Sequence, residues 1–474
     1  MPDPLYSPRR RTGLLLCGAG TAGGYQAGVL NALAEAGVKI DIVAAHGPGV
    51  LNALCAAADG TAVLDGGGPW TRSSLKRAYR WRMALRLAAA GLFIVLLLLL
   101  SPLLLLVGAG LIYAASLLAS LASLTDTAAW LVETYGLTLT VVLNPPIMPT
   151  LVPRGMVLGL LIVAGVLLVA AIRAAVAERS RRHMRGAFWW RLVGAPLGGD
   201  EPGATLVETL WRLVRGASGG SRPAAAEMGR RYVELLVENL GQPGFRELLI
   251  AVHDVDARRD LVGAVLLPDS IRAFVGRRTR PAPREADSFD LTGATGTLVV
   301  DFLQGAMRLP VATPPQPIVF PAESYWRGEM HHLCDRPDLA SRLLDELIAA
   351  GAEQIVMVGA APAPGGPHSL KPRPIDLRGR VGAFLRSVET AAFDTAWARA
   401  SGVTERVFVV RPVHNPIGPF DFTGVYDDAS DRYRAMSELV RQGYDDAYQQ
   451  FIEPVVAGGA LAESEGPGHV LRKT

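Results

Sequence analysis

Two glycine-rich turns are the places where this sequence could hold reactive groups. The first contains Gly18, Gly20 and Gly23 and follows the apolar run Thr12–Cys17, which is typical of a buried strand. The second, His46-Gly47-Pro48-Gly49, follows a second apolar run, Ile40–Ala45. A turn from a strand into a helix can expose a catalytic side chain, and it gathers backbone N–H groups that favour anions.

Helical patterns follow both turns and would hold them in place. Tyr25–Ala36 has an apolar face with helical spacing and is followed by Gly37, a common C-terminal stop. Val50–Ala58 is the second expected helix, and Pro48 stands where a first-turn proline is tolerated. Strands that alternate with helices predict an α/β fold with a mostly parallel sheet flanked by helices.

The stretch from Thr12 to Ala58 resembles the patatin-like phospholipase family. In that family the first strand leads into a G-G-G-x-R-G oxyanion loop, and the second leads into a G-x-S-x-G nucleophile elbow. The segments YQAGVLNALAEAGVKIDIVAA and VLNAL carry the similarity here. The resemblance implies a patatin-like α/β fold and descent from lipid acyl hydrolases.

The motifs depart from the family pattern where catalysis depends on them. Gly47 stands in the position of the serine, and glycine has no side chain to attack an ester. Pro48 removes a backbone N–H beside that position. In the glycine loop Ala22 replaces the family's arginine, and Ala19 replaces one glycine. The residues expected to form an oxyanion loop or ligand-binding turn are Gly18, Ala19, Gly20, Gly23, Pro48 and Gly49.

The family's catalytic aspartate has its best sequence match at Arg327, within Ser324–Glu329. Arginine stays protonated at neutral pH and cannot act as a general base. A different alignment would make Asp301 or Asp335 the functional acid. The sequence therefore predicts a non-hydrolytic protein that binds lipid or acts as a membrane scaffold. The alternative is an active lipid acyl hydrolase with an unrecognised nucleophile, for which Cys17 is a candidate.

Two further patterns compete with this interpretation. Gly18-Ala19-Gly20-Thr21-Ala22-Gly23 is formally the G-x-G-x-x-G dinucleotide fingerprint, with Asp41 as its acidic partner, although Asp41 lies near the start of the next strand rather than at its end. His331, His332, Cys334 and Asp335 could form a metal cluster, but their spacing is too tight for one helix face and favours a polar loop. We therefore expect no cofactor and no metal site.

Composition limits the remaining classes. The chain has 474 residues and a net charge of +3, without a basic stripe interleaved with aromatic residues, so no nucleic-acid partner is expected. The three cysteines lie far apart and indicate a reducing compartment. The N-terminus lacks the long apolar run of a secretory signal.

A long apolar insert indicates a membrane. Leu87–Leu124 contains no charged residue, and Gly155–Ile172 is a second uncharged run. Basic residues flank the outer ends of both runs, whereas Thr125–Pro153 contains only the acidic Asp126 and Glu133. The positive-inside rule then predicts two helices, about 87–124 and 155–177, joined by an external loop. A break at Ser101-Pro102 would give three crossings instead.

The expected organisation follows from these assignments. Residues 1–11 form a tail, 12–86 the first part of the α/β domain, 87–177 the transmembrane insert, 178–456 the rest of the domain with a final helix over 429–456, and 457–474 a flexible tail. We expect a multi-pass protein of the cytoplasmic membrane with its α/β domain in the cytoplasm and membrane lipid as partner. The sequence does not identify a protein partner.

Overall fold

The computed structural model describes residues 6–144, 148–177, 194–216, 220–276, 284–363, 377–404, 406–413, 416–427 and 432–457. These residues form two compact units. The first, the α/β unit, comprises 1–80 and 197–474, and the second, the helical unit, comprises 81–196. The predicted tails and the basic segment 179–185 lie largely outside the described residues. Tyr6, which was assigned to a tail, is buried, and its ring packs edge-on against Phe451.

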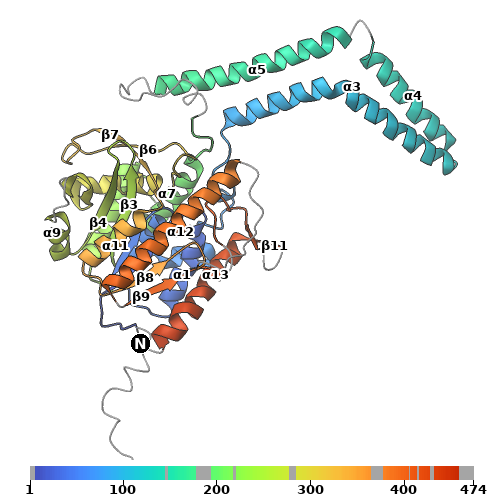
Figure 1. Ribbon diagram of the computed structural model, residues 1–474. Coiled ribbons are helices and arrows are strands. Elements are labelled where there is room, and N and C mark those ends of the chain that lie inside the picture. Colours follow the sequence, from blue (N-terminus) through green and yellow to red (C-terminus); the bar gives the residue numbers. More distant parts are fainter. Residues whose placement is uncertain are drawn as a thin grey trace, which may run out of the picture. The chain divides into compact units, whose positions relative to one another are not determined.

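The α/β unit is built on one sheet with the order β5-β4-β3-β2-β1-β8-β9 (Figure 1). Strand β1 (Thr12–Leu16) pairs in parallel with β2 (Ile42–Ala45) and with β8 (Gln354–Val358). Beyond them, β3 (Glu247–Asp254) and β9 (Val407–Val410) extend the parallel set. The sheet is completed by β4 (Arg259–Val265), β5 (Ser288–Asp290), β6 (Gln316–Val319) and β7 (Met330–Cys334), and β3 pairs antiparallel with both β4 and β7.

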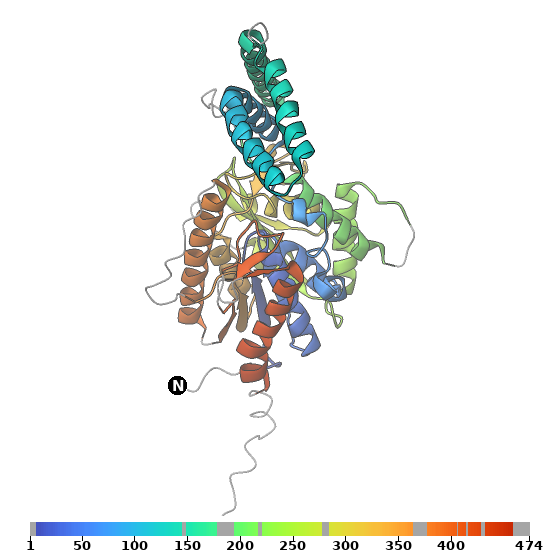
Figure 2. The same ribbon diagram turned by 90° about the vertical axis from the view of Figure 1, so that its right-hand side faces the viewer.

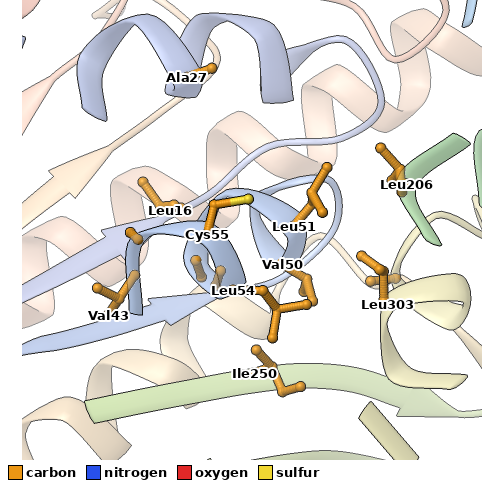
Figure 3. Close-up of a cluster of buried hydrophobic side chains, with 14 of the residues drawn as sticks. Leu16, Ala27, Val43, Val50, Leu51, Leu54, Cys55, Leu206, Ile250 and Leu303 are labelled. Atoms are coloured by element: carbon orange, nitrogen blue, oxygen red, sulfur yellow. The ribbon is translucent and has the colours of Figure 1, made fainter. Parts of the chain in front are cut away.

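Helices cover both faces of this sheet, because alternate residues of β1 point in opposite directions. Leu14 and Leu16 belong to a core shared with α1 (Ala22–Glu35) and α2 (Gly49–Ala57). Leu15 and Cys17 belong to a second core with α11 (Leu339–Ala349) and α12 (Leu377–Val403). Figure 3 shows the first core around Val50, Leu51 and Leu54 of α2, and Figure 2 shows helices on either side of the sheet. The remaining helices are α7 (Asp200–Arg215), α8 (Ala225–Asn239), α9 (Pro268–Gly276), α10 (Val299–Ala306) and α13 (Met436–Ala447).

Two parts of the α/β unit differ from the sequence predictions. His331 and His332 lie on strand β7 rather than in a polar loop. The final helix begins at Met436 and continues as a π-helix over Tyr448–Ala457, because the preceding residues form a hairpin of β10 (Val425–Asp427) and β11 (Arg432–Arg434).

The helical unit consists of α3 (Met83–Leu121), α4 (Thr125–Val142) and α5 (Met148–Ala177). Helix α3 and the segment Val152–Arg173 of α5 are long and apolar enough to cross a membrane. The segment between them was expected to be an external loop, but most of it is α4. Pro153 lies inside α5, where it cannot donate an intrahelical hydrogen bond.

Helix α3 runs through Pro102 without ending there. Proline removes one intrahelical hydrogen bond, and Figure 1 shows a bend midway along the helix. Before the bend α3 packs against α5, where a Cβ atom on Gly159 would lie 2.5 Å from Val95. After the bend it packs against α4, and the Tyr135 hydroxyl donates to the Leu105 carbonyl. The proline thus divides α3 between two partner helices.

Candidate functional site

The glycine loop lies between the end of β1 and the start of α1, and its backbone requires glycine. Gly18 has a φ of 148° and Gly20 a φ of 54°, both in the region that favours glycine. A Cβ atom on Gly20 would lie 1.9 Å from the carbonyl oxygen of Pro419. A Cβ atom on Gly23 would lie 2.4 Å from the Trp70 ring. The loop is therefore held in close contact with the surrounding chain.

A buried polar network fixes the backbone of the loop. Gln26 Nε2 donates to the Cys17 carbonyl at 3.0 Å, and Asn52 Nδ2 donates to the Gly23 carbonyl at 2.8 Å. Trp70 Nε1 donates to Asn52 Oδ1 at 2.9 Å. Gln26 and Asn52 come from α1 and α2, so the helices after the two turns hold the glycine loop in one conformation.

The second turn has the backbone of a nucleophile elbow. Gly47 connects β2 to α2 with a φ of 57°, a left-handed conformation that costs a residue with a Cβ atom more than glycine. A Cβ atom at this position would lie 2.4 Å from the Gly18 carbonyl oxygen and 2.9 Å from Asp335 Oδ2. Pro48 and Gly49 begin α2 and are buried. The turn thus places residue 47 beside the glycine loop and a carboxylate.

Asp335 is the acid next to the elbow. It follows β7, and its Oδ1 lies 3.0 Å from His46 Nδ1, with both residues 1% exposed. Burial alone would lower the pKa of His46, but the Asp335 carboxylate raises it well above the usual value. His46 Nε2 has no hydrogen-bond partner among the described residues. The Asp335 carboxylate therefore favours the protonated form of the buried His46 ring.

Arg327, which the sequence match placed in the position of the family aspartate, does not lie beside Gly47. Arg327 lies on the exposed segment before β7, whereas the side chain that meets residue 47 is Asp335. Asp301, the other acid considered, is in the first turn of α10, and burial raises its pKa to about 6. Asp335, rather than Arg327, is therefore the charged side chain that this structure places beside residue 47.

Two further titratable groups surround the glycine loop. Glu389, on α12, has Oε1 3.3 Å from where a Cβ atom on Gly18 would lie, and burial raises its pKa to about 8. Its Oε1 is buried and has no hydrogen-bond partner in the described part of the chain. Burial also raises the pKa of the Cys17 thiol, which makes it a poor nucleophile.

The candidate site is closed to solvent. Gly18, Ala19, Gly20, Ala22 and Gly23 are all buried, as are the residues of the elbow turn. The segment Ile417–Phe422 covers the loop: the Thr21 hydroxyl donates to the Gly418 carbonyl and accepts from the Asp421 N–H at 2.9 Å. The loop is therefore covered in this conformation, and residue 47 presents no side chain to it.

The metal and dinucleotide interpretations fail on geometry. His331 Nδ1 pairs with Asp254, and His332 Nδ1 pairs with Asp256, so each imidazole is bound to its own carboxylate. Among the described residues no group of three or more His, Cys, Asp or Glu side chains could hold a metal ion. Asp41 accepts from the Thr12 N–H at the start of β1, which is the end of the strand opposite the glycine loop.

Sequence reasoning missed three residues around the loop. Asp335 was considered as a metal ligand or an alternative acid, but its contact with the elbow depends on the antiparallel pairing of β3 with β7. Glu389 and Pro419 are more than 300 residues from the loop they contact, and no local pattern marks them. A buried glutamate in a helix with few other acids was the one available signal.

Comparisons with known proteins identify no family. No family model matches the chain, and no curated protein matches it. Among solved structures, VipD from Legionella pneumophila is similar with a TM-score of 0.30 and 12% sequence identity. The similarity covers 93% of this chain and 66% of the VipD chain, so this chain spans slightly less than two thirds of that protein. At this TM-score the similarity supports no conclusion about function.

Proposed function

We propose that this protein descends from patatin-like lipid acyl hydrolases, no longer hydrolyses esters, and acts in lipid binding or as a scaffold at a membrane. Gly47 carries the proposal. It has the left-handed backbone of a nucleophile elbow, it lies between the glycine loop and Asp335, and it has no side chain. Loss of a catalytic serine lowers turnover by about 10⁶ in serine hydrolases.

The surrounding residues differ from a hydrolase site in more than the missing side chain at residue 47. Asp335 lies beside residue 47 but is paired with His46. Pro48 supplies no N–H for an oxyanion, and Ala22 supplies no positive charge. Segment Ile417–Phe422 covers the loop. These features favour a structural role for the turn over a working esterase.

The helical unit supports a location in a membrane. At 1.5 Å per residue, the 39 residues of α3 extend about 58 Å, well beyond the roughly 30 Å of a bilayer core. Arg82 and Arg86 precede the apolar part of α3, and Arg173 follows that of α5. The positive-inside rule favours a cytoplasmic location for both outer ends and for the α/β unit connected to them.

Ester hydrolysis and covalent labelling test the proposal on the full chain in detergent. We expect no turnover of lysophospholipid or short acyl esters and no labelling by a serine-reactive phosphonate. Gly47→Ser places a hydroxyl beside Asp335 and should gain phosphonate labelling, provided that the Gly18 carbonyl shifts to admit the new Cβ atom and that the segment Ile417–Phe422 opens to admit the probe.

Gly66→Ser is the matched control, because Gly66 has a φ of 61° but no neighbour within 4 Å of a Cβ atom. It should remain unlabelled. Hydrolysis or labelling of the unaltered protein would establish the alternative, an active hydrolase with another nucleophile. A folded Gly47→Ser variant that stays unlabelled even after Thr21→Ala removes the contacts holding Ile417–Phe422 over the loop would contradict the assignment of residue 47 as the elbow.

A further inference from the structure

A cavity of about 280 Å³ lies on the α/β unit, between the start of α12 and the segment that covers the glycine loop. Its lining combines two arginines with small residues that expose backbone. The lining used in this argument is Arg378, Gly382, Arg386, Gly418, Phe420 and Asp421. Its size is just below the range of about 300–1,000 Å³ typical of small-molecule sites.

Both arginines have donors that the protein does not use. Arg378 Nη2 donates to the Phe420 carbonyl at 2.9 Å, and its guanidinium lies over the Phe420 ring, 5.3 Å from the centroid. Arg378 Nε is nevertheless buried without a hydrogen-bond partner among the described residues. The Arg386 side chain is partly buried, and its guanidinium forms no hydrogen bond or ion pair within the described residues.

The one acid in the lining does not neutralise this pair. Asp421 Oδ2 accepts from the Gly418 N–H at 3.1 Å and so stabilises its own turn. Burial raises the pKa of Asp421, whereas the charges of Arg386 and Arg378 oppose that shift. With two cations and one constrained acid, the cavity has an excess of positive charge and unused guanidinium donors.

We propose that this cavity binds a phosphate monoester group, with Arg378 and Arg386 donating to the phosphoryl oxygens. Arginine presents a planar fork of N–H groups that matches phosphate, and such charge-assisted hydrogen bonds are stronger than neutral ones. The position of Arg378 and Gly382 in the first turns of α12 adds the positive end of the helix dipole. A lipid headgroup and a soluble phosphate ester share this chemistry, and the probes described below distinguish between them.

The proposed site is separate from the closed elbow but adjoins it through one segment. Gly418 and Asp421 line the cavity, and both are hydrogen-bonded to Thr21 of the glycine loop. The proposal does not depend on the loss of hydrolysis, because it uses neither Gly47 nor Asp335. Its failure would therefore leave the function proposed above untouched.

Binding to the full chain tests the site with three probes. Inorganic phosphate and glycerol 3-phosphate are titrated against the protein in detergent by calorimetry. The third probe is a nanodisc of phosphatidylcholine with phosphatidic acid, compared with phosphatidylcholine alone, read as a shift in melting temperature. Arg386→Gln should weaken binding at least tenfold, and Arg378→Gln should do the same. Arg380→Gln is the matched control, since Arg380 is exposed in the same helix and does not line the cavity.

The outcomes separate the sources of the phosphate. Binding of the soluble probes that is lost in Arg386→Gln and kept in Arg380→Gln supports a soluble ester. A response only to phosphatidic acid, with the same dependence on Arg386, supports a lipid headgroup. No response to any probe, or equal binding by Arg386→Gln and Arg380→Gln, overturns the proposal. If Arg386→Gln fails to fold, Arg386→Lys keeps the charge without the fork and should bind with intermediate affinity.

Discussion

Asp335 and His46 form a buried ion pair beside a turn that has no catalytic side chain. Each residue is 1% exposed, and the carboxylate and the imidazole lie 3.0 Å apart. Burying a charge without a partner costs free energy, and the attraction between Asp335 and His46 offsets part of that cost for each residue. The pair therefore stabilises the folded protein only as a unit.

Removal of the charge from Asp335 should destabilise the α/β unit. Asp335→Asn leaves the buried His46 without a counter-ion, which costs about 3 kcal/mol for a buried pair. Chemical denaturation followed by tryptophan fluorescence would measure the change. Asp269→Asn is the control: it breaks a pair with Arg272 whose aspartate is 94% exposed, and such surface pairs contribute only about 0–1 kcal/mol. Equal stabilities of the two variants would contradict the buried pair.

Glu389 should make the protein less stable as the pH rises. Burial raises its pKa from 4.5 to about 8, so the folded protein keeps a proton that the unfolded chain loses. Unfolding then releases a proton between these two pH values, and stability falls across that window.

Glu389→Gln removes this effect because glutamine does not ionise. The variant should therefore melt at a higher temperature than the unaltered protein at pH 8, with a smaller difference at pH 5. Melting temperatures from pH 5 to 9 would show this. Glu323→Gln, at an exposed site, should leave the pH profile unchanged. Parallel profiles for Glu389→Gln and the unaltered protein would show that the Glu389 carboxyl ionises normally.

At the level of elements, local patterns predicted the first two strands of the sheet and the helices that follow them. The strands around 12–17 and 40–45 and the helices after them appear as β1, α1, β2 and α2. Apolar runs and glycine stops determine these elements within a few residues of chain. The predictions failed at α4 and at β7, where neighbouring elements decide the structure: α4 packs along α3, and β7 pairs with β3 and β6.

In the candidate site, too, the sequence predicts the local features but not the contacts between distant elements. The two glycine turns and the missing side chain of Gly47 are visible in the sequence because they are local. The groups that face them, Asp335, Glu389 and Pro419, come from distant strands, helices and loops. Their positions follow from strand order, which the chain does not encode in any short motif.

Close packing of α3 against α5 should depend on glycine. A leucine at Gly159 would collide with Val95, because even a Cβ atom would lie 2.5 Å from that side chain. Gly159→Leu should therefore lower the melting temperature of the helical unit in detergent by several degrees. Gly165→Leu is the control, since nothing lies within 4 Å of a Cβ atom there. If both variants melt alike, these two helices do not pack as described.

At the scale of the whole molecule, the helical unit is inserted between two adjacent points of the α/β unit. The Gly198 N–H donates to the Arg80 carbonyl at 2.9 Å, and the Leu197 N–H donates to the Ala312 carbonyl at 2.9 Å. Residues before and after the insert therefore meet without it. The α/β unit has its own cores and does not need the helices to complete its sheet.

Replacement of 81–196 by two glycines should leave a folded α/β unit that is soluble without detergent. Two residues reach across the short gap between Arg80 and Leu197. Size-exclusion chromatography and circular dichroism would show a monodisperse protein with mixed helix and strand. A second variant has six glycines in place of two. If both shortened chains aggregate, the two units depend on each other.

The insertion also sets the order in which a nascent chain can fold. Strand β2 ends at Ala45 and its neighbour β3 begins at Glu247, so about 200 residues separate two adjacent strands. At roughly 5–20 residues per second, a ribosome needs about 10–40 s to make that interval. The apolar helices leave the exit tunnel before β3, and β8, the other neighbour of β1, comes later still. Strands β1 and β2 are thus synthesised first but are among the last to complete their pairing. They must be kept from aggregating while the apolar helices leave the ribosome.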